Sequence, residues 1–328
     1  MSFVRNDGVA YTVIESAHEG QRIDNFLLRI CKGVPKSHVY RILRNGEVRV
    51  NSGRVDAAYR LVLGDRIRIP PLRLALPSAS AEGQEPTRSA RAVPLPIVFE
   101  DNSLLAIDKP AGLAVHGGSG ISAGVIEALR AERAPEDFLE LVHRLDRETS
   151  GVLLVAKKRA ALRGLQDQFR EGRIDKHYLV LVRGTWREPI RHVRLPLFKY
   201  LDAEGERRVR VDGESGRAAH TVFRVLRTGT RFSLLDAQLK TGRTHQIRVH
   251  LAHLGFPIVG DDKYGDFTLN RLVQRQGLKR MFLHAWRLRL THPASGEAIH
   301  LEAGLPAALT GFIDYLTTRG ELPRGKTI

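Results

Sequence analysis

A polar stretch without apolar periodicity, LPSASAEGQEPTRSARAVP (residues 76–94), interrupts this chain, and no single hydrophobic core can include it. Its content of Ala, Ser, Pro and Gly is typical of a linker. A chain of 328 residues also exceeds what one core usually organises. We therefore expect folded parts over residues 20–75 and 95–320, with an N-terminal extension over 1–19 and a tail over 321–328.

The smaller part is predicted to contain two amphipathic helices and a hairpin. Apolar residues recur at helical spacing in QRIDNFLLRI (21–30) and in PKSHVYRILRNG (35–46), where Gly46 suits a C-terminal cap. EVRVNSGRV (47–55) alternates in polarity and turns at Asn51–Gly53, as a hairpin does.

The charge of the whole chain decides how the second helix is interpreted. A run of charges is in most proteins only a solvated surface. Here Lys+Arg 52 against Asp+Glu 36 gives a net charge of +16, which is typical of a protein that binds a polyanion. A membrane surface would need a basic amphipathic helix or a lipidation signal, and the sequence shows neither. We therefore favour contact with RNA or DNA, through the helix residues Lys36, Ser37, Arg41 and Arg44.

Several features predict a cytoplasmic protein. The lone Cys31 cannot form an internal disulfide, which fits a reducing compartment. The first residues, MSFVRNDGVAYTV, lack the apolar region of a signal peptide. No apolar run approaches the roughly 18–20 residues that span a bilayer.

The larger part mixes strands with few helices. Strands are expected in IVFEDNSLLAIDKPAGLAV (97–115), GVLLVAKK (151–158), DKHYLVLVRG (175–184) and RFSLLDAQLK (231–240). Helices are expected in GVIEALRAE (124–132), in ALRGLQDQFREG (161–172), and in THQIRVHLAHLG (244–255) with Thr244 as N-cap. Because no regular strand–helix–strand spacing appears, this pattern indicates an α+β domain with a mainly antiparallel sheet.

Most familiar catalytic signatures are missing from the sequence. His250 and His253 lie one helical turn apart, but no Cys pair or H-E-x-x-H motif accompanies them and their neighbours are basic. The glycine-rich HGGSG (116–120) lacks the Lys-Ser/Thr ending of a P-loop. Serine nucleophile elbows and catalytic-cysteine signatures are absent. We therefore expect neither a metal nor another cofactor.

One short polar loop, HRLDRETSG (143–151), lies between the apolar runs FLELV and GVLLVA. It places Asp146 between Arg144 and Arg147, and nearby guanidinium charge should keep this group a carboxylate at neutral pH. Asp146 with Glu148 could suggest glycoside hydrolysis, but no apolar pocket is evident to raise either pKa. A permanent carboxylate suits a nucleophile or a base. A structural ion pair explains the charges equally simply, and on charge alone it is the better interpretation.

Longer motifs around this loop resemble a known family. HRLDRETSGVLLVAKK (143–158) is similar to the signature of the RluA family of pseudouridine synthases. DKHYLVLVRG and TGRTHQIRVHLAHLGFPIVGDDKYG (241–265) resemble the second and third motifs of that family. The smaller part resembles an RNA-binding module that many members share with a small-subunit ribosomal protein. The resemblance runs from about Glu19 to Leu316, excluding the linker.

The resemblance implies roles for individual residues. Asp146 would be the essential carboxylate, acting as nucleophile or as base at the ribose of a flipped-out uridine. Tyr178 would stack on the base and assist proton removal at C5. Arg248 would pair with the catalytic Asp146, although Arg243 is an alternative partner.

The remaining site residues come from the same resemblance. Arg144 would fill the space that the flipped base leaves, and Ile247 would pack under the uracil. His245 and Gln246 are assigned to RNA contact together with Arg243.

The motifs are most similar to those of family members that modify large-subunit ribosomal RNA. The resemblance implies isomerisation of uridine to pseudouridine by a monomer that needs neither a cofactor nor a protein partner. Transfer RNA as the substrate stays open. So does a non-catalytic RNA-binding assembly factor, although such a protein could dispense with Asp146, Tyr178 and Arg248.

Overall fold

The structure is a computed structural model, and it divides the chain into two compact units, with the boundary between Arg91 and Ala92. It describes residues 8–15, 18–31, 34–72, 94–117, 124–134 and 137–325. The boundary falls within the expected linker, which lies outside the described residues except for Pro94. Within the described ranges, no helix combines the length and the apolar composition needed to cross a bilayer.

The small unit packs two helices on one face of a four-stranded antiparallel sheet. The helices are α1 (Ile23–Ile30) and α2 (Lys36–Arg44), as the apolar spacing predicts. The strands, in spatial order, are β1 (Ala10–Val13), β4 (Arg66–Ile69), β2 (Arg49–Val50) and β3 (Gly53–Arg54). The β2–β3 hairpin turns through Asn51 and Ser52, whose φ angles are 48° and 70°.

Strand β1 is not predicted by the sequence, which assigns residues 1–19 to an extension outside the small unit. Its four residues pair in register with β4, from Ala10 opposite Ile69 to Val13 opposite Arg66. The strand lacks a strong sequence signal because it lies at the sheet edge and only half of its side chains are covered.

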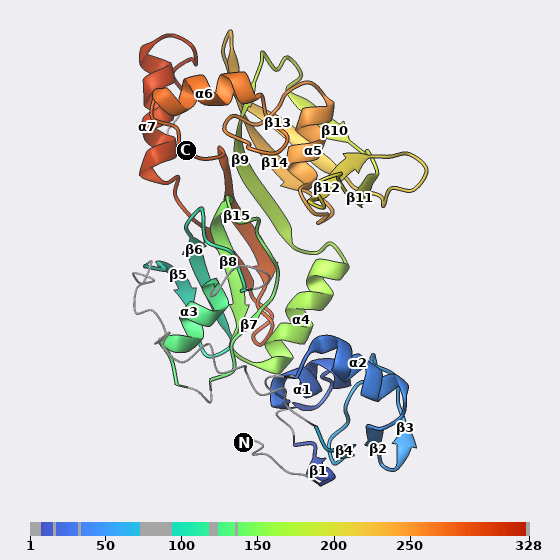
Figure 1. The fold of residues 1–328 in the computed structure, drawn as a ribbon. Helices are drawn as coiled ribbons and strands as arrows, with labels where there is room; N and C mark the ends of the chain where they lie inside the picture. The colour runs from blue at the N-terminus through green and yellow to red at the C-terminus, as the bar shows by residue number, and fades with distance from the viewer. Residues whose placement is uncertain are drawn as a thin grey trace, which may run out of the picture. The chain divides into compact units, whose positions relative to one another are not determined.

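The large unit is built on a ten-stranded sheet among the described residues, shown in Figure 1. The main path runs through β10 (Ile190–Val193), β13 (Thr221–Thr228), β14 (Phe232–Leu239), β9 (Asp175–Arg183), β15 (Leu283–Thr291), β8 (Ser150–Ala156), β6 (Leu104–Lys109) and β5 (Ile97–Glu100). Two short strands complete it: β16 (Ala298–Glu302) beside β15, and β7 (Glu140–Leu141) beside β8. Among the described strands, every pairing is antiparallel except that of β15 with β8. The predicted α+β fold with a mainly antiparallel sheet is confirmed.

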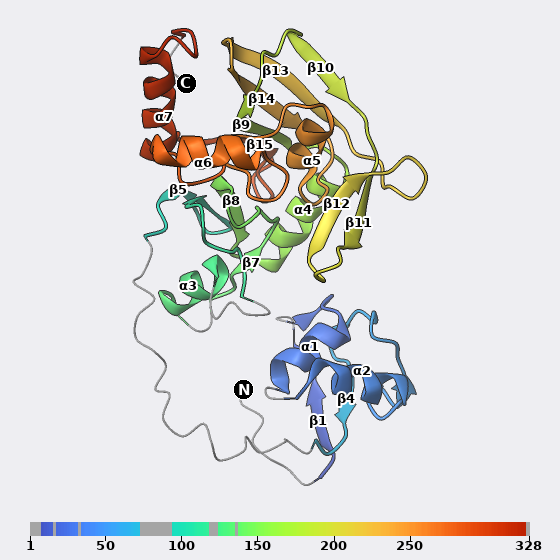
Figure 2. The same ribbon diagram turned by 45° about the horizontal axis from the view of Figure 1, so that its top comes forward.

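Helices cover both faces of this sheet. Leu153 and Val155 of β8 face the core that contains α3 (Val125–Ala131) and α5 (Gln246–His253), whereas Val152 and Leu154 face α4 (Arg159–Arg170). The helices α6 (Phe267–Arg275) and α7 (Ala307–Thr318) pack on β9 and β14 through a separate apolar cluster. These helices are visible in Figure 2.

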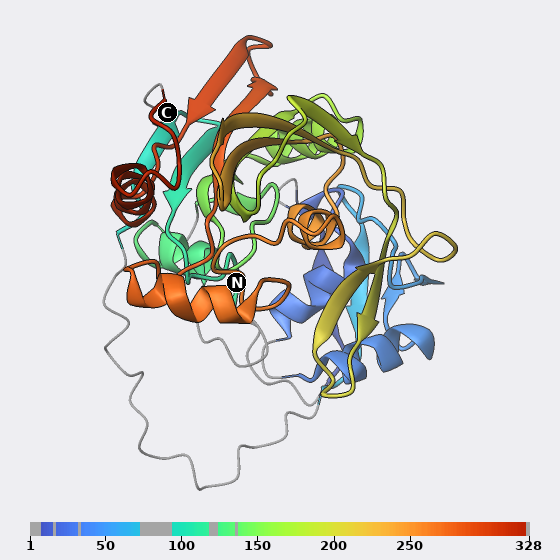
Figure 3. The ribbon, with the colours of Figure 1, turned by 90° about the horizontal axis from the view of Figure 1, so that it is seen from above.

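A two-stranded hairpin, β11 (Leu197–Leu201) with β12 (Arg207–Val211), stands apart from the main sheet and packs on α5 through Leu197, Val209 and Val249. Figure 3 shows α5 lying between this hairpin and the curved end of the sheet that contains β13 and β14. Helix α5 is therefore enclosed from two sides, and its first residues come to lie near the end of the loop that precedes β8.

The one parallel pairing of the described strands requires a glycine. Gly151 of β8 lies opposite Ala285 of β15 and has a φ of +109°. A Cβ atom added at Gly151 would meet the carbonyl oxygen of Ala285 at 2.1 Å, which is backbone and cannot move aside. Gly151 therefore lets β8 and β15 approach closely where the loop 143–149 ends.

We expect Gly151→Ala to lower the free energy of unfolding of the large unit by about 2–4 kcal/mol, because it adds a clash to an unfavourable φ. Gly164→Ala is the matched control: this glycine lies within α4, and its added Cβ would meet nothing closer than Pro293 at 3.5 Å. Gly164→Ala should stabilise by about 0.5–1 kcal/mol, as alanine is the better helix former.

Urea denaturation followed by tryptophan fluorescence measures both variants, since the two tryptophans, Trp186 and Trp286, belong to the large unit. Equal midpoints for the two variants would contradict the expected clash at Gly151.

Candidate active site

A cavity of about 770 Å³ lies in the large unit, between the loop 143–149, strand β9 and the start of α5. Eight of the residues selected from the sequence line it: Arg144, Asp146, Tyr178, Arg243, His245, Gln246, Ile247 and Arg248. Segments more than 100 residues apart in the chain therefore meet at one site, as the interaction between Asp146 and Arg248 across 102 positions illustrates.

The four residues selected on α2 belong to the small unit. Lys36, Ser37, Arg41 and Arg44 all belong to α2, where Ser37, Arg41 and Arg44 are exposed. Arg41 contacts the ring of His38 at 3.1 Å.

The loop 143–149 is fixed by a fully buried lysine. The Nζ atom of Lys109 donates to three backbone carbonyl oxygens, those of Pro110 (2.8 Å), Leu113 (2.8 Å) and Arg147 (3.0 Å). Burial lowers the pKa of Lys109 to about 7. The backbone N–H of Gly112 also donates to the carbonyl of Arg147, at 2.9 Å. Lys109 therefore ties the loop to the turn after β6.

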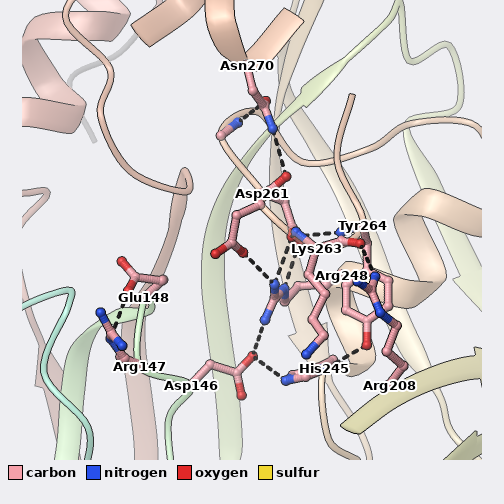
Figure 4. Close-up of polar contacts among 12 residues, drawn as sticks. Asp146, Arg147, Glu148, Arg208, His245, Arg248, Asp261, Lys263, Tyr264 and Asn270 are labelled. Atoms are coloured by element: carbon pink, nitrogen blue, oxygen red, sulfur yellow. Dashed lines mark hydrogen bonds and ion pairs between the residues drawn. The ribbon is translucent and has the colours of Figure 1, made fainter. Parts of the chain in front are cut away.

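Asp146 meets a buried arginine inside the cavity. The Nη1 atom of Arg248 donates to Oδ2 of Asp146 at 3.2 Å, as Figure 4 shows. The Arg248 side chain is 6% exposed and that of Asp146 is 29% exposed. The contacts of Asp146 with Arg248 and with His245 are both made by Oδ2. Neither of these two contacts uses Oδ1.

A second carboxylate, Asp261, holds Arg248 in place. Arg248 donates from Nε to Oδ2 of Asp261 at 2.7 Å and from Nη2 to Oδ1 at 2.8 Å, and both side chains are buried. The backbone N–H groups of Lys263 and Tyr264 donate to the same carboxylate. Burial alone would raise the pKa of Asp261, but its hydrogen bonds from Arg248 lower it below the ordinary value.

Arg248 keeps its positive charge despite its burial. Burial would lower its pKa, but the hydrogen bonds and negative charges of Asp261 and then Asp146 raise the pKa above its ordinary value. Arg248 therefore remains a cation throughout the accessible pH range, and its position is set before any substrate arrives.

His245 approaches Asp146 from the other side. Its Nε2 atom lies 3.9 Å from Oδ2 of Asp146, and its Nδ1 atom lies 2.8 Å from the hydroxyl of Tyr264. That hydroxyl already accepts the backbone N–H of Val209 at 3.0 Å. Burial lowers the pKa of His245, so the ring is neutral at pH 7. We assign the hydroxyl proton of Tyr264 to Nδ1, which places the ring proton on Nε2, facing Asp146.

Helix α5 starts one residue later than the sequence predicts. The sequence suggests Thr244 as the N-cap, but the cap is His245 and the helix begins at Gln246. His245 has φ 53° and ψ 22°, a left-handed conformation that is uncommon for residues other than glycine. This backbone turn directs its ring into the cavity rather than along the helix.

Tyr178 supplies an apolar wall with one polar atom. It comes from β9, is 9% exposed, and lies in the same apolar cluster as Ile247. Burial raises the pKa of Tyr178 well above its ordinary value, and the charge of Asp146 raises it further. At neutral pH the side chain is a neutral phenol, with an O–H donor and a ring face.

Comparisons with known proteins find matches to both units of the chain. The family model described as RNA pseudouridylate synthase matches residues 103–253, and the model described as S4 domain matches residues 21–67. "Ribosomal large subunit pseudouridine synthase C" from Yersinia pestis is 51% identical over 92% of this chain and 93% of its own length. The protein of that name from Haemophilus influenzae is 47% identical over 95% of this chain and 96% of its own length.

This chain belongs to the family of RNA pseudouridine synthases. A solved structure titled "Human RNA Pseudouridylate Synthase Domain Containing 4" is also similar, with 27% identity, a TM-score of 0.56, and coverage of 70% of this chain and 95% of that one. The family model ends at the last residue of α5, so it includes both segments that meet at the cavity.

Two residues that the sequence assigns to RNA or to Asp146, Arg243 and Gln246, make hydrogen bonds within the protein instead. Arg243 donates from Nε to the carbonyl of Ala218 at 3.0 Å, so Arg248 rather than Arg243 is the arginine that contacts Asp146. Gln246 is buried, and its side-chain oxygen accepts from Thr241 and from the backbone of Arg243. Its amide nitrogen donates to the carbonyl of His220 and the hydroxyl of Thr221. The prediction that Gln246 contacts RNA does not fit these bonds, because they engage both ends of its amide inside the protein.

The arginines adjacent to Asp146 in the sequence do not neutralise it. Arg147 contacts Glu148 at 3.2 Å, and Arg144 is exposed at the cavity rim. The guanidinium that contacts Asp146 comes from α5. The ion-pair partner of Asp146 is therefore set by tertiary structure and not by the loop itself.

Sequence reasoning missed three residues that the synthase site depends on: Lys109, Asp261 and Tyr264. Asp261 and Tyr264 belong to the quoted motif GDDKYG, so a signal was available there. Lys109 lies in KPAG, which is typical of an ordinary turn with a solvated lysine, and only its burial distinguishes it.

We expect Asp261→Asn to destabilise the large unit by about 3 kcal/mol or more, because it leaves the buried charge of Arg248 without its main partner. Asp262→Asn is the control: its side chain is 79% exposed and lies 3.4 Å from Arg248, so it should change stability by less than about 0.5 kcal/mol.

Urea denaturation followed by tryptophan fluorescence at pH 7 measures the difference between these two aspartates. Because the folded pKa of Asp261 lies below its ordinary value of 3.8, its contribution is complete above that pH and is lost as pH falls further. Equal stabilities of the two variants at pH 7 would show that Asp261 does not neutralise Arg248.

Proposed function

We propose that this synthase isomerises specific uridines of large-subunit ribosomal RNA to pseudouridine, with Asp146 acting on a flipped-out uridine. The observation that carries the proposal is the buried Arg248, which is fixed by Asp261 and directed at Asp146 in a cavity. The names of the relatives and the S4 domain match support ribosomal RNA as the substrate class.

The reaction is an exchange of bonds within one nucleotide. The N1–C1′ glycosidic bond breaks, the uracil rotates, and a C5–C1′ bond forms. C5 loses its hydrogen and N1 gains one, so the product is an isomer of the substrate. Such a reaction needs neither an oxidant nor an energy source, which is consistent with the absence of nucleotide-binding motifs from the sequence.

Asp146 is suited to begin this reaction in either of two ways. As a nucleophile its Oδ1 atom would attack C1′, and as a base the same atom would remove a proton from the ribose. In both cases Oδ2 stays bound to Arg248, which holds the carboxylate in one orientation. Arg248 serves as a fixed positive charge rather than a proton donor, since its pKa is raised.

Tyr178 is suited to hold the base. Its ring and the side chain of Ile247 form apolar surface beside Asp146, on which a planar uracil can pack. Because Tyr178 is a neutral phenol, removal of the C5 proton by its oxygen requires that the phenol proton leave at the same time. The charge of Asp146 also raises the pKa of Tyr178, so the two side chains are coupled electrostatically.

Arg144 is suited to compensate the extrusion of the base. Flipping a nucleotide out of a helix costs a few kcal/mol of stacking and pairing. Arg144 is exposed at the rim of the cavity, where a long planar side chain can enter the vacated position. As part of the same proposal, the protein acts in the cytoplasm as a monomer without a protein partner.

We expect Asp146→Asn to lower turnover to below about 0.1% of wild type, because the amide is neither a nucleophile nor a base at neutral pH. The dissociation constant for RNA should change little, since the side chain keeps its size. Tritium release from RNA labelled at uracil C5 measures turnover.

Glu148→Gln is the matched control, since this neighbouring carboxylate contacts Arg147 instead of Arg248. It should keep at least about half of the activity. Substantial turnover by Asp146→Asn, or equal losses in both variants, would remove Asp146 from its proposed role.

A second expectation concerns metal ions. In the described part of the chain, no three His, Cys, Asp or Glu side chains gather as metal ligands do. We expect tritium release to survive EDTA once the RNA has been folded with a monovalent salt, because the proposed chemistry uses protein side chains and no metal ion. Activity that disappears in chelator and returns only with zinc would contradict this expectation.

A further inference from the structure

The outer face of the small unit's sheet carries an unusual row of arginines. Arg68 of β4 pairs directly with Tyr11 of β1 on one side and with Arg49 of β2 on the other. Arg66 lies two residues before Arg68 and therefore on the same face. We call Arg49, Arg66, Arg68 and Tyr11 the arginine face.

This face points away from the helices of the small unit. The alternate residues, Val50, Ile67 and Ile69, are buried in the core that α1 and α2 cover. Arg49 and Arg66 are exposed, Arg68 is half-buried, and the Tyr11 side chain is 52% exposed. Arg41 and Arg44 of α2, the other basic residues of this unit that are predicted to contact RNA, are also exposed.

The positive charges of this face are not neutralised within the described residues. Arg49 and Arg68 donate to backbone carbonyls, those of Ser52 (3.3 Å) and Glu47 (2.7 Å). Arg66 places its guanidinium 4.5 Å from the centre of the Tyr11 ring. Like charges directly opposite each other destabilise a sheet, so Arg49 opposite Arg68 is unfavourable in the absence of an anion.

We propose that the arginine face binds the phosphate backbone of RNA, as a second RNA surface of the small unit. The inference rests on the proposed function, which makes ribosomal RNA the substrate. Guanidinium groups match phosphate oxygens in geometry and charge. The backbone and ring contacts also restrict these side chains before binding, which reduces the entropy cost when phosphate arrives.

The net charge of +16 and the S4 domain match over residues 21–67 favour RNA over an acidic protein as the partner. That match includes Arg49 and Arg66, and Arg68 follows directly after it.

The experiment compares four full-length proteins: wild type, R49Q/R66Q/R68Q, R49K/R66K/R68K and the control R271Q/R275Q/R289Q. The control removes the same charge from exposed positions of the large unit. The probe is an unmodified transcript of large-subunit ribosomal RNA, and the dissociation constant is measured over a range of salt concentrations. Circular dichroism verifies that each variant is folded.

We expect the glutamine variant to lower the log–log salt slope by about two to three units, at about 0.7–0.9 for each phosphate that the protein no longer neutralises. Its affinity near 0.15 M salt should fall by about tenfold or more. The lysine variant keeps the charge and should retain most of the slope, and the control should retain the wild-type slope.

Turnover at saturating RNA should be unchanged in the glutamine variant, because the active site belongs to the large unit. A folded glutamine variant with the wild-type slope, or an equal reduction in the control, would overturn the arginine face as an RNA surface. Failure of the wild-type protein to form pseudouridine in this transcript would instead count against the proposed function. The two failures are thus distinguishable.

Discussion

The active site depends on one buried cation held between two carboxylates. A guanidinium removed from water is costly unless its charge and its donors are satisfied. Asp261 satisfies Arg248 through two short hydrogen bonds, and the same carboxylate receives two backbone N–H groups that fix its own position. The remaining nitrogen of Arg248 points at Asp146. The Asp146 carboxylate is therefore oriented by a buried group with fixed partners, so little reorganisation of this pair is needed when a substrate binds.

A second buried cation acts on the backbone of the same loop. Lys109 donates to the carbonyl of Arg147, next to Asp146, while Arg248 contacts the side chain of Asp146 itself. The two cations approach the loop from different elements, the end of β6 and the first turn of α5. Gly151 then lets the chain leave the loop directly into the parallel pairing with β15. Lys109 thus holds the backbone of the loop, and Arg248 holds the side chain of Asp146.

The arginines of this chain differ in whether a carboxylate neutralises them. In the large unit, arginines such as Arg133, Arg183 and Arg208 form ion pairs with acidic residues at 2.6–2.8 Å. On the sheet of the small unit, Arg49 and Arg68 contact backbone carbonyls instead. An arginine that is already paired with a carboxylate contributes little to the binding of a polyanion. An arginine without a carboxylate partner keeps its charge available for a phosphate group. This difference supports the proposed RNA contact of the arginine face, which net charge alone cannot identify.

The sequence by itself determined the helices α1 to α5, the β2–β3 hairpin, the strands β8, β9 and β14, the α+β class and the position of Asp146, because these follow from local periodicity, turn residues and long motifs. It failed where the deciding partner is distant in the chain. The resemblance implies Gln246 as an RNA contact, but its amide nitrogen donates to His220 and Thr221, which lie 26 and 25 positions away in the chain. Strand β1 exists only because β4 pairs with it. Whether Arg144, Arg147, Arg243 or Arg248 neutralises Asp146 was decided by tertiary structure alone, since charge interactions depend on distance and burial in space, and neither is encoded by separation along the chain.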